Sequence, residues 1–474
     1  MSRQGEDKRY AKGDGVVFYG LIGLYLIAPL PLGSVGMDMV YLICGVTYAL
    51  SAFWCLLFVY DKAHLSRSFR RSWPILILWG LYLIYVFLQA KSSVFAPSSP
   101  LAMQIHAASN ITGLPTAPTI SIHSHATLMQ GWLSLAYFLI FCLTLLVVRS
   151  HKRLRILAYA IAVCGVVQAC YGIFMAMSGF DASGMGDRIA HGSFFNRNHF
   201  AGYLELCLPV AIGLLAGSAR IPRTQYGWRE WLQQTVRFLL SQKASLRIGI
   251  LIMALGLILS RSRMGNSAFL GSLTLVSLAF SIFTEGTFRT RLLVIWVTIL
   301  TVDVTILGSY FGLEELQQRL EQTTTTEVSN RVDISDHLQY YVFDYQPWGS
   351  GLGTFRDAFK AYQSELIRID YDYAENDYLQ FLGELGMIGS APLALMVLTS
   401  LGLAMRGAYQ TQQIFIKGMN FAFVMAMVSL LIHSSVDFNL QIPANSMLLV
   451  GLLALPWLTP YLRQEKVVSL ENRG

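Results

Sequence analysis

Long apolar runs separated by short polar segments dominate the sequence. Most of these runs are about 20 residues long, which is the length that a helix needs to cross the hydrocarbon core of a membrane. The runs predict twelve membrane-spanning helices over residues 16–34, 38–60, 73–90, 130–149, 154–180, 200–217, 246–262, 264–283, 291–312, 385–405, 416–438 and 443–462. The pattern therefore predicts an all-α polytopic helix bundle, folded as a single integral membrane domain over residues 1–474.

Two of the polar connections are long. The first covers residues 91–129 and is rich in Ser, Thr, Ala and Pro. The second covers residues 313–384, before the tenth predicted helix, and carries the turn residues Pro347, Gly349 and Gly351. A long loop beside a membrane is typical of a functional segment, because most connections in compact domains are short.

Composition and charge agree with a membrane protein and add its orientation. Only 13% of the residues are charged, against about 25% in ordinary soluble domains. Lys and Arg gather in the N-terminal tail and in the second, fourth and sixth connections, whereas residues 91–129 contain one lysine. The positive-inside rule then predicts that both termini are cytoplasmic and that both long connections lie outside. The net charge of +7 is thereby explained without a nucleic-acid partner.

Cationic side chains also occur at the predicted outer ends of helices, for example in "LSRSRMGN". Ionisable residues at the membrane boundary are costly and usually have a partner, and guanidinium groups bind phosphate through paired hydrogen bonds. Taken together, they favour a phosphate or pyrophosphate site over the alternative that each side chain extends to lipid headgroups. The residues of this predicted site are Arg188, Arg197, His199, Arg261, Arg263 and Arg331.

His433 and Asp437 lie four residues apart at the outer end of the predicted helix 416–438. Helical spacing places them on one face, where they could pair with each other or line a cavity. A hydrogen bond that ties this helix to a neighbour is the simpler interpretation, and direct participation in the chemistry is the alternative.

The segment 371–389, "YDYAENDYLQFLGELGMIG", brings acidic residues to the start of a predicted membrane helix. Asn376 is a good N-cap, and Asp377 in the first turn complements the helix dipole. Helix capping does not explain Glu375, which lies just before the helix. A carboxylate at such a position can act as a general base toward a hydroxyl group.

Five segments in this order resemble the O-antigen ligase/polymerase superfamily, which includes the ligases that join O-antigen to lipid A-core, the Wzy-type polymerases and the protein O-oligosaccharyltransferases. The resemblance covers roughly residues 165 to 450. The matching segments are "GSFFNRNHFAGYLELCLPVAIGLL", "LSRSRMGNSAF", "NRVDISDHLQYYVFDYQPWGSGLGTF", "AENDYLQFLGELGMIG" and "HSSVDFNLQIPAN".

The resemblance implies a GT-C-like glycosyltransferase of the bacterial inner membrane that works at the periplasmic face. It implies a polyprenyl-diphosphate-linked glycan as donor, a glycan or lipid A-core as acceptor, and neither a metal nor another cofactor. The family's diphosphate-binding arginines fall on Arg263 or Arg261 and on Arg331. The family's His-Asn motif falls on Glu375-Asn376, so this chain has glutamate where many members have histidine.

These residues predict one displacement with inversion at the anomeric carbon. The arginines would stabilise the charge that develops on the diphosphate, and Glu375 would remove the proton of the acceptor hydroxyl. A transporter for a lipid-linked glycan or an anionic solute is the alternative from another class of protein. The chain shows no internal repeat of the kind on which many transporters are built. The sequence does not choose between lipid A-core, a growing glycan and a protein as acceptor.

Overall fold

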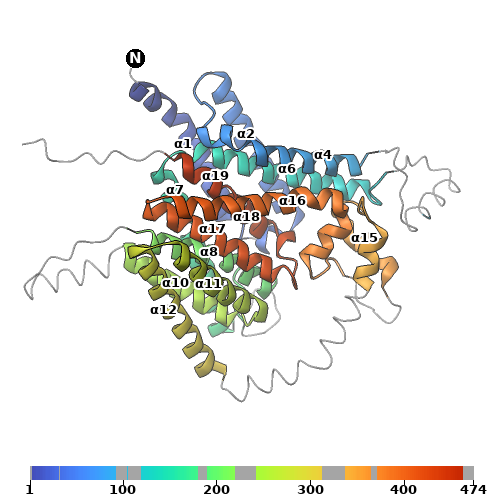
Figure 1. The fold of residues 1–474 in the computed structure, drawn as a ribbon. Helices are drawn as coiled ribbons and strands as arrows, with labels where there is room; N and C mark the ends of the chain where they lie inside the picture. Colours follow the sequence, from blue (N-terminus) through green and yellow to red (C-terminus); the bar gives the residue numbers. More distant parts are fainter. Residues whose placement is uncertain are drawn as a thin grey trace, which may run out of the picture.

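The computed structural model describes residues 3–30, 32–91, 104, 119–179, 189–218, 242–311, 337–363 and 371–462, and these residues form helices without a β-strand (Figure 1). The long helices are α1 (Arg3–Ile27), α2 (Met37–Val59), α4 (Trp73–Gln89), α6 (Ser124–Val147), α7 (His151–Ser178), α8 (Arg197–Ala216), α10 (Gln242–Leu259), α11 (Arg263–Phe283), α12 (Gly286–Phe311), α16 (Asp377–Gln410), α17 (Ile414–His433) and α18 (Pro443–Leu453). The short helices are α3 (Arg67–Arg71), α15 (Phe355–Phe359) and α19 (Leu455–Leu458), with 3-10 turns at Leu32–Ser34, Lys360–Tyr362, Asn439–Gln441 and Thr459–Tyr461.

The predicted polytopic helix bundle is confirmed. Each of the twelve predicted spans overlaps one of the long helices. Among the described residues, eight helical segments are long and apolar enough to cross a membrane, so the protein is a multi-pass membrane protein. The eight are α2, α6, α7, α8, α11, α16, α17 and the segment Pro443–Tyr461. Twelve crossings and the cytoplasmic position of both termini remain predictions.

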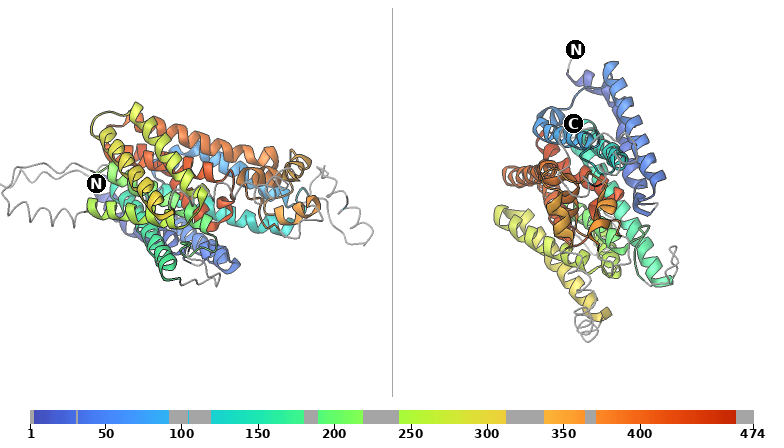
Figure 2. Two further views of the ribbon diagram at one scale, coloured as in Figure 1. Left: turned by 90° about the horizontal axis from the view of Figure 1, so that it is seen from below. Right: turned by 90° about the vertical axis from the view of Figure 1, so that its right-hand side faces the viewer.

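Helix α8 is the central helix of the bundle. It contacts α7, α10, α11 and α17, and 94% of the residues in its apolar stretch are buried, against 22% for α2. Gly213 of α8 and Gly418 of α17 allow these two helices to approach closely, since a Cβ atom on either would collide with the backbone of the other helix. In Figure 1, α2, α4 and α6 lie along one side of α8, α16 and α17, and α10–α12 lie along the other. The right-hand view of Figure 2 shows the same arrangement from the end of the bundle.

Both long connections contribute to one end of the bundle. Residues 337–363, which we call the cap, form a helix over 337–344, then α15 and a 3-10 turn. The cap has a small hydrophobic core of its own that includes Tyr341 and Phe355. It joins the first connection through a hydrogen bond from Ile122 N to Ser350 O (2.9 Å) and a contact between His123 Nδ1 and Asp357 Oδ2 (2.7 Å).

Helix α16 begins at Asp377, eight residues before the predicted span 385–405, and it is kinked at Gly386 (φ 64°, ψ −175°). The kink lies against Gly349 of the cap, and each glycine occupies a position where a Cβ atom would collide with the opposite backbone. The buried Glu384 binds the cap as well, because its Oε1 accepts a hydrogen bond from Phe355 N (3.0 Å). The first two turns of α16 thus belong to the cap end of the bundle rather than to the apolar span.

Candidate functional site

The start of α16 carries the predicted pair Glu375 and Asn376. As predicted, Asn376 is the N-cap, and its Oδ1 accepts a hydrogen bond from Leu379 N (3.1 Å). Its Nδ2 donates to the Ser435 carbonyl (2.8 Å) in the turn after α17. Glu375 has a left-handed backbone (φ 48°) and an exposed side chain. A non-glycine residue in this conformation is uncommon, and such residues cluster at functional sites.

Asp377 fastens this start to the turn after α17. Its buried carboxylate accepts hydrogen bonds from Ser434 Oγ (2.8 Å) and Leu440 N (3.0 Å), and its own N–H donates to the Ser434 carbonyl (3.0 Å). The sequence predicts Asp377 only as a first-turn residue, because the partners lie about sixty positions away along the chain. The backbone beside Glu375 is therefore held by a second segment.

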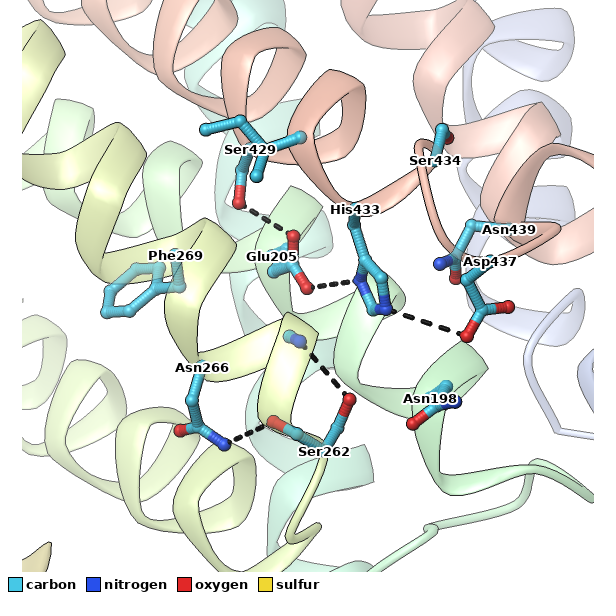
Figure 3. Close-up of polar contacts among 12 residues, drawn as sticks. Asn198, Glu205, Ser262, Asn266, Phe269, Ser429, His433, Ser434, Asp437 and Asn439 are labelled. Atoms are coloured by element: carbon cyan, nitrogen blue, oxygen red, sulfur yellow. Dashed lines mark hydrogen bonds and ion pairs between the residues drawn. The ribbon is translucent and has the colours of Figure 1, made fainter. Parts of the chain in front are cut away.

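A buried chain of acidic and histidine side chains lies beside this turn, and Figure 3 shows its members Glu205, His433 and Asp437. His433 Nδ1 is 2.7 Å from Glu205 Oε1, and His433 Nε2 is 3.6 Å from Asp437 Oδ2. His199 Nε2 lies 3.4 Å from the other oxygen of Asp437. Ser429 completes the chain by donating a hydrogen bond to Glu205 Oε2 (2.7 Å). These contacting side chains join α8, α17 and the turn after α17.

Helix α17 ends at His433, five residues before the predicted end at 438, so Asp437 lies in the following turn. Burial alone would raise the pKa of Asp437, but the imidazoles of His199 and His433 lower that pKa well below its ordinary value. Asp437 is therefore ionised at neutral pH. The geometry favours the simpler interpretation of His433 and Asp437, in which they tie α17 to a neighbouring helix.

The predicted cationic residues occur at two adjacent helix starts. Arg197 is the first residue of α8 and Arg263 is the first residue of α11, and both are exposed. Neither helix has an acidic residue in its first turn. The two starts pack together, since a Cβ atom on Gly265 would lie 2.6 Å from the Ala201 Cβ.

Arg261 lies in the turn between α10 and α11 with a left-handed backbone (φ 51°). Glu205 lies beside the start of α11, because a Cβ atom on Gly265 would be 3.2 Å from Glu205 Oε1. The structure thus places the Arg261–Arg263 turn, the buried acidic and histidine side chains and the Glu375 turn at one end of the bundle. Arg188 and Arg331 lie outside the described residues.

A protein-family model described as O-antigen ligase matches residues 248–394. The match covers less than a third of the chain and supports its membership of the O-antigen ligase/polymerase superfamily. The family consists of glycosyltransferase-like enzymes that act on lipid-linked glycans, so the match supports an enzyme of glycan transfer. A search of curated protein sequences finds no match.

The segment that matches the O-antigen ligase family includes Arg261, Arg263, Glu375 and Asn376, and it extends from α10 into α16. Glu205 precedes the segment, and His433 and Asp437 follow it. Sequence reasoning missed Glu205. The signal was a lone carboxylate inside the apolar run 200–217, because an ionisable residue within a membrane span usually has a partner and a function.

Asn376 provides a first testable prediction. Replacing it with alanine should destabilise the start of α16 by about 1 kcal/mol, because the N-cap hydrogen bond is lost. The midpoint of thermal unfolding in detergent measures the change. Asn376→Ser keeps a capping oxygen and should retain most of the stability; equal stability of wild type and Asn376→Ala would show that the cap is unimportant.

Proposed function

We propose that the protein transfers a glycan from a polyprenyl-diphosphate-linked donor to an acceptor hydroxyl at the periplasmic face of the inner membrane. The observation that carries this proposal is the pair of adjacent helix starts headed by Arg197 and Arg263. A cation at the start of a helix is unfavourable, because the helix dipole is positive there. An anion bound between the two starts would remove this cost and would meet backbone N–H groups as well. A diphosphate at the membrane boundary fits these requirements.

In the reaction, the bond between the anomeric carbon of the donor and the diphosphate oxygen breaks. Negative charge develops on the diphosphate, and Arg263 and Arg197, with Arg261 in the adjoining turn, would stabilise it. We extend this role to Arg188 and Arg331 on the strength of the family resemblance. The acceptor oxygen attacks the anomeric carbon from the face opposite the diphosphate, and the diphosphate leaves with the bonding electron pair. A single displacement of this kind inverts the configuration.

Glu375 would accept the proton of the attacking hydroxyl. It replaces the histidine that many members of the family have, and its exposed side chain can reach a bound acceptor. Asn376 and Asp377 would act as positioning residues, since their hydrogen bonds hold the backbone next to Glu375. The buried His199, His433 and Asp437 would position the turn after α17 rather than contact the substrate.

The binding role of Arg263 leads to a prediction. Arg263→Lys keeps the charge but loses the planar, two-pronged donor geometry. Turnover should fall by about 10- to 100-fold, since a hydrogen bond to a charged group contributes about 1.5–3 kcal/mol. The measurement is the rate of glycan transfer at saturating acceptor. The matched control is Arg289→Lys, near the start of α12 at the opposite end of the bundle, which should behave as wild type. Normal donor affinity and turnover in Arg263→Lys would contradict the diphosphate assignment.

Three acceptors remain to be separated: lipid A-core, a growing glycan and a protein side chain. We favour a ligase or polymerase of a surface polysaccharide, because the family model is that of O-antigen ligases. The glycan profile of a deletion strain separates them. Full-length polymer that stays unattached would indicate a ligase, and products of a single repeat would indicate a polymerase. An unchanged surface glycan together with unmodified protein would indicate a protein O-oligosaccharyltransferase.

A further inference from the structure

A pocket of about 190 Å³ lies beside the Glu375 turn. Three segments that are distant in the sequence line it: the cap, the residues before α16 and the turn after α17. Aromatic rings make up much of its wall, and polar groups occur where the Glu375 turn meets the turn after α17. Its apolar part includes Phe355, Phe359, Tyr371, Tyr373 and Ala374.

Neighbouring rings hold the aromatic wall in place. Phe355 and Phe359 stack on each other (centroids 4.9 Å apart, planes 17° apart), and each is only 1% exposed, so they support the wall from the core of the cap. Tyr371 meets Phe359 edge-on, at 6.4 Å and 83°. Tyr373 stacks on Phe438 at 4.6 Å. A wall that is ordered before binding loses little entropy when a ligand arrives.

The polar side of the pocket is the side of the proposed base. Glu375, Asn376 and Ser435 all line it. Burial, and then the negative charge of Glu375, raise the pKa of Tyr371. The Tyr371 hydroxyl therefore stays protonated at neutral pH and can donate a hydrogen bond close to Glu375.

The size and chemistry of the pocket fit one sugar ring. Pockets for drug-sized ligands have volumes of about 300–1,000 Å³, so this smaller pocket suits a single six-membered ring. A pyranose has an apolar C–H face that can stack on the partly exposed rings of Tyr371 and Tyr373. It also has hydroxyl groups that can meet Glu375, Asn376 and Ser435. The polyprenyl tail of a donor has only the apolar part of this chemistry, and it must remain in the bilayer.

We propose that this pocket binds one sugar ring of the acceptor glycan and so brings an acceptor hydroxyl to Glu375. The inference rests on the proposed function, because it gives the acceptor half of the same site a substrate class. Tyr371 and Tyr373 are then binding residues for the acceptor, and the arginines at the helix starts serve the donor.

Binding of sugars to the purified full-length protein in detergent tests this assignment. The probes are the core and repeat-unit oligosaccharides that mild acid releases from the envelope of the cells that make the protein. Saturation-transfer NMR detects their binding without requiring turnover. Two variants alter the pocket in opposite ways: Tyr371→Ala removes part of the wall, and Ala374→Leu fills the space. Tyr340→Ala is the matched control, because Tyr340 is in the cap, is 66% exposed and does not line the pocket.

We expect an oligosaccharide to bind wild type and Tyr340→Ala equally, and to bind both pocket variants about tenfold more weakly, as expected for the loss of a ring contact. The KM for the acceptor should rise in the same two variants, and the KM for the donor should stay constant. Thermal unfolding must show that both variants are folded. If Ala374→Leu is not folded, Tyr373→Phe takes its place, because this variant keeps the stacked ring and removes only a hydroxyl group.

Equal binding by all folded variants, or no binding by the wild type, would overturn the inference. Binding of a serine-containing peptide in place of the sugars would overturn it in favour of a protein acceptor. Normal transfer by both pocket variants would reject the pocket while leaving the proposed function intact. Sugar binding in this pocket without any transfer would instead reject the proposed function.

Discussion

Replacing Glu375 with glutamine should lower the rate of glycan transfer by about 100- to 10,000-fold, which is the contribution of a positioned general base. Glutamine has nearly the same shape as glutamate but cannot accept the proton of the acceptor hydroxyl. The side chain is exposed, and glutamine keeps its size and one of its acceptor oxygens, so the unfolding midpoint should change little. The measurement is single-turnover transfer at saturating donor and acceptor.

The matched control for Glu375→Gln is Asp372→Asn. Asp372 lies three residues earlier, is 60% exposed and pairs with Arg356 on the surface, so this variant should retain activity. Glu375→His places the residue of many family members at this position and should restore part of the transfer. Near-normal activity of Glu375→Gln would remove Glu375 from the chemistry, and equal loss in Asp372→Asn would point to a general effect of charge.

Replacing Glu205 with alanine should destabilise the folded protein by about 3–5 kcal/mol, the range measured when one partner of a buried ion pair is removed. Glu205 is fully buried in the central helix, and its carboxylate meets both His433 and Ser429. The variant would leave His433 without its closest partner in the described chain and would open a cavity between α8 and α17. A large fall in the midpoint of unfolding in detergent is expected.

A surface pair offers the control for Glu205→Ala. Arg356→Ala breaks an ion pair whose side chains are more than half exposed, and such pairs contribute only about 0–1 kcal/mol. Glu205→Gln keeps hydrogen-bonding atoms near Ser429 and His433, so it should be less destabilising than Glu205→Ala. If Glu205→Ala unfolds at the wild-type temperature, the contacts of Glu205 with His433 and Ser429 do not hold α8 and α17 together.

Much of the fold could be predicted from the sequence, because a membrane span requires a long apolar run and a helix start requires a cap. Each predicted span overlaps a helix, and Asn376 caps α16 as its position before the apolar pattern indicates. The end of α17 was placed too late, because Val436 and Phe438 continue the apolar pattern beyond His433. Contacts with Asp377 draw that segment into a turn, and no local pattern reports them.

The candidate site was less predictable, because its parts are brought together by tertiary contacts. Arg263 and Glu375 stood out as charged residues at helix ends, but their nearness to the Glu205–His433–Asp437 chain depends on how α8, α11 and α17 pack. The pocket beside Glu375 combines residues from Leu338 to Val436, and its aromatic residues look like ordinary core or loop residues in the sequence. The roles of Arg188 and Arg331 remain predictions.

The most direct test of the proposed function is transfer by the purified protein in detergent, with a polyprenyl-diphosphate-linked glycan and an acceptor oligosaccharide. Detergent abolishes the sealed compartments that a transporter needs, so only an enzyme can change the donor under these conditions. We predict a glycosylated acceptor with inverted configuration at the new linkage, together with released polyprenyl diphosphate. Recovery of the donor unchanged, by a protein that binds it, would contradict glycan transfer and favour a transporter.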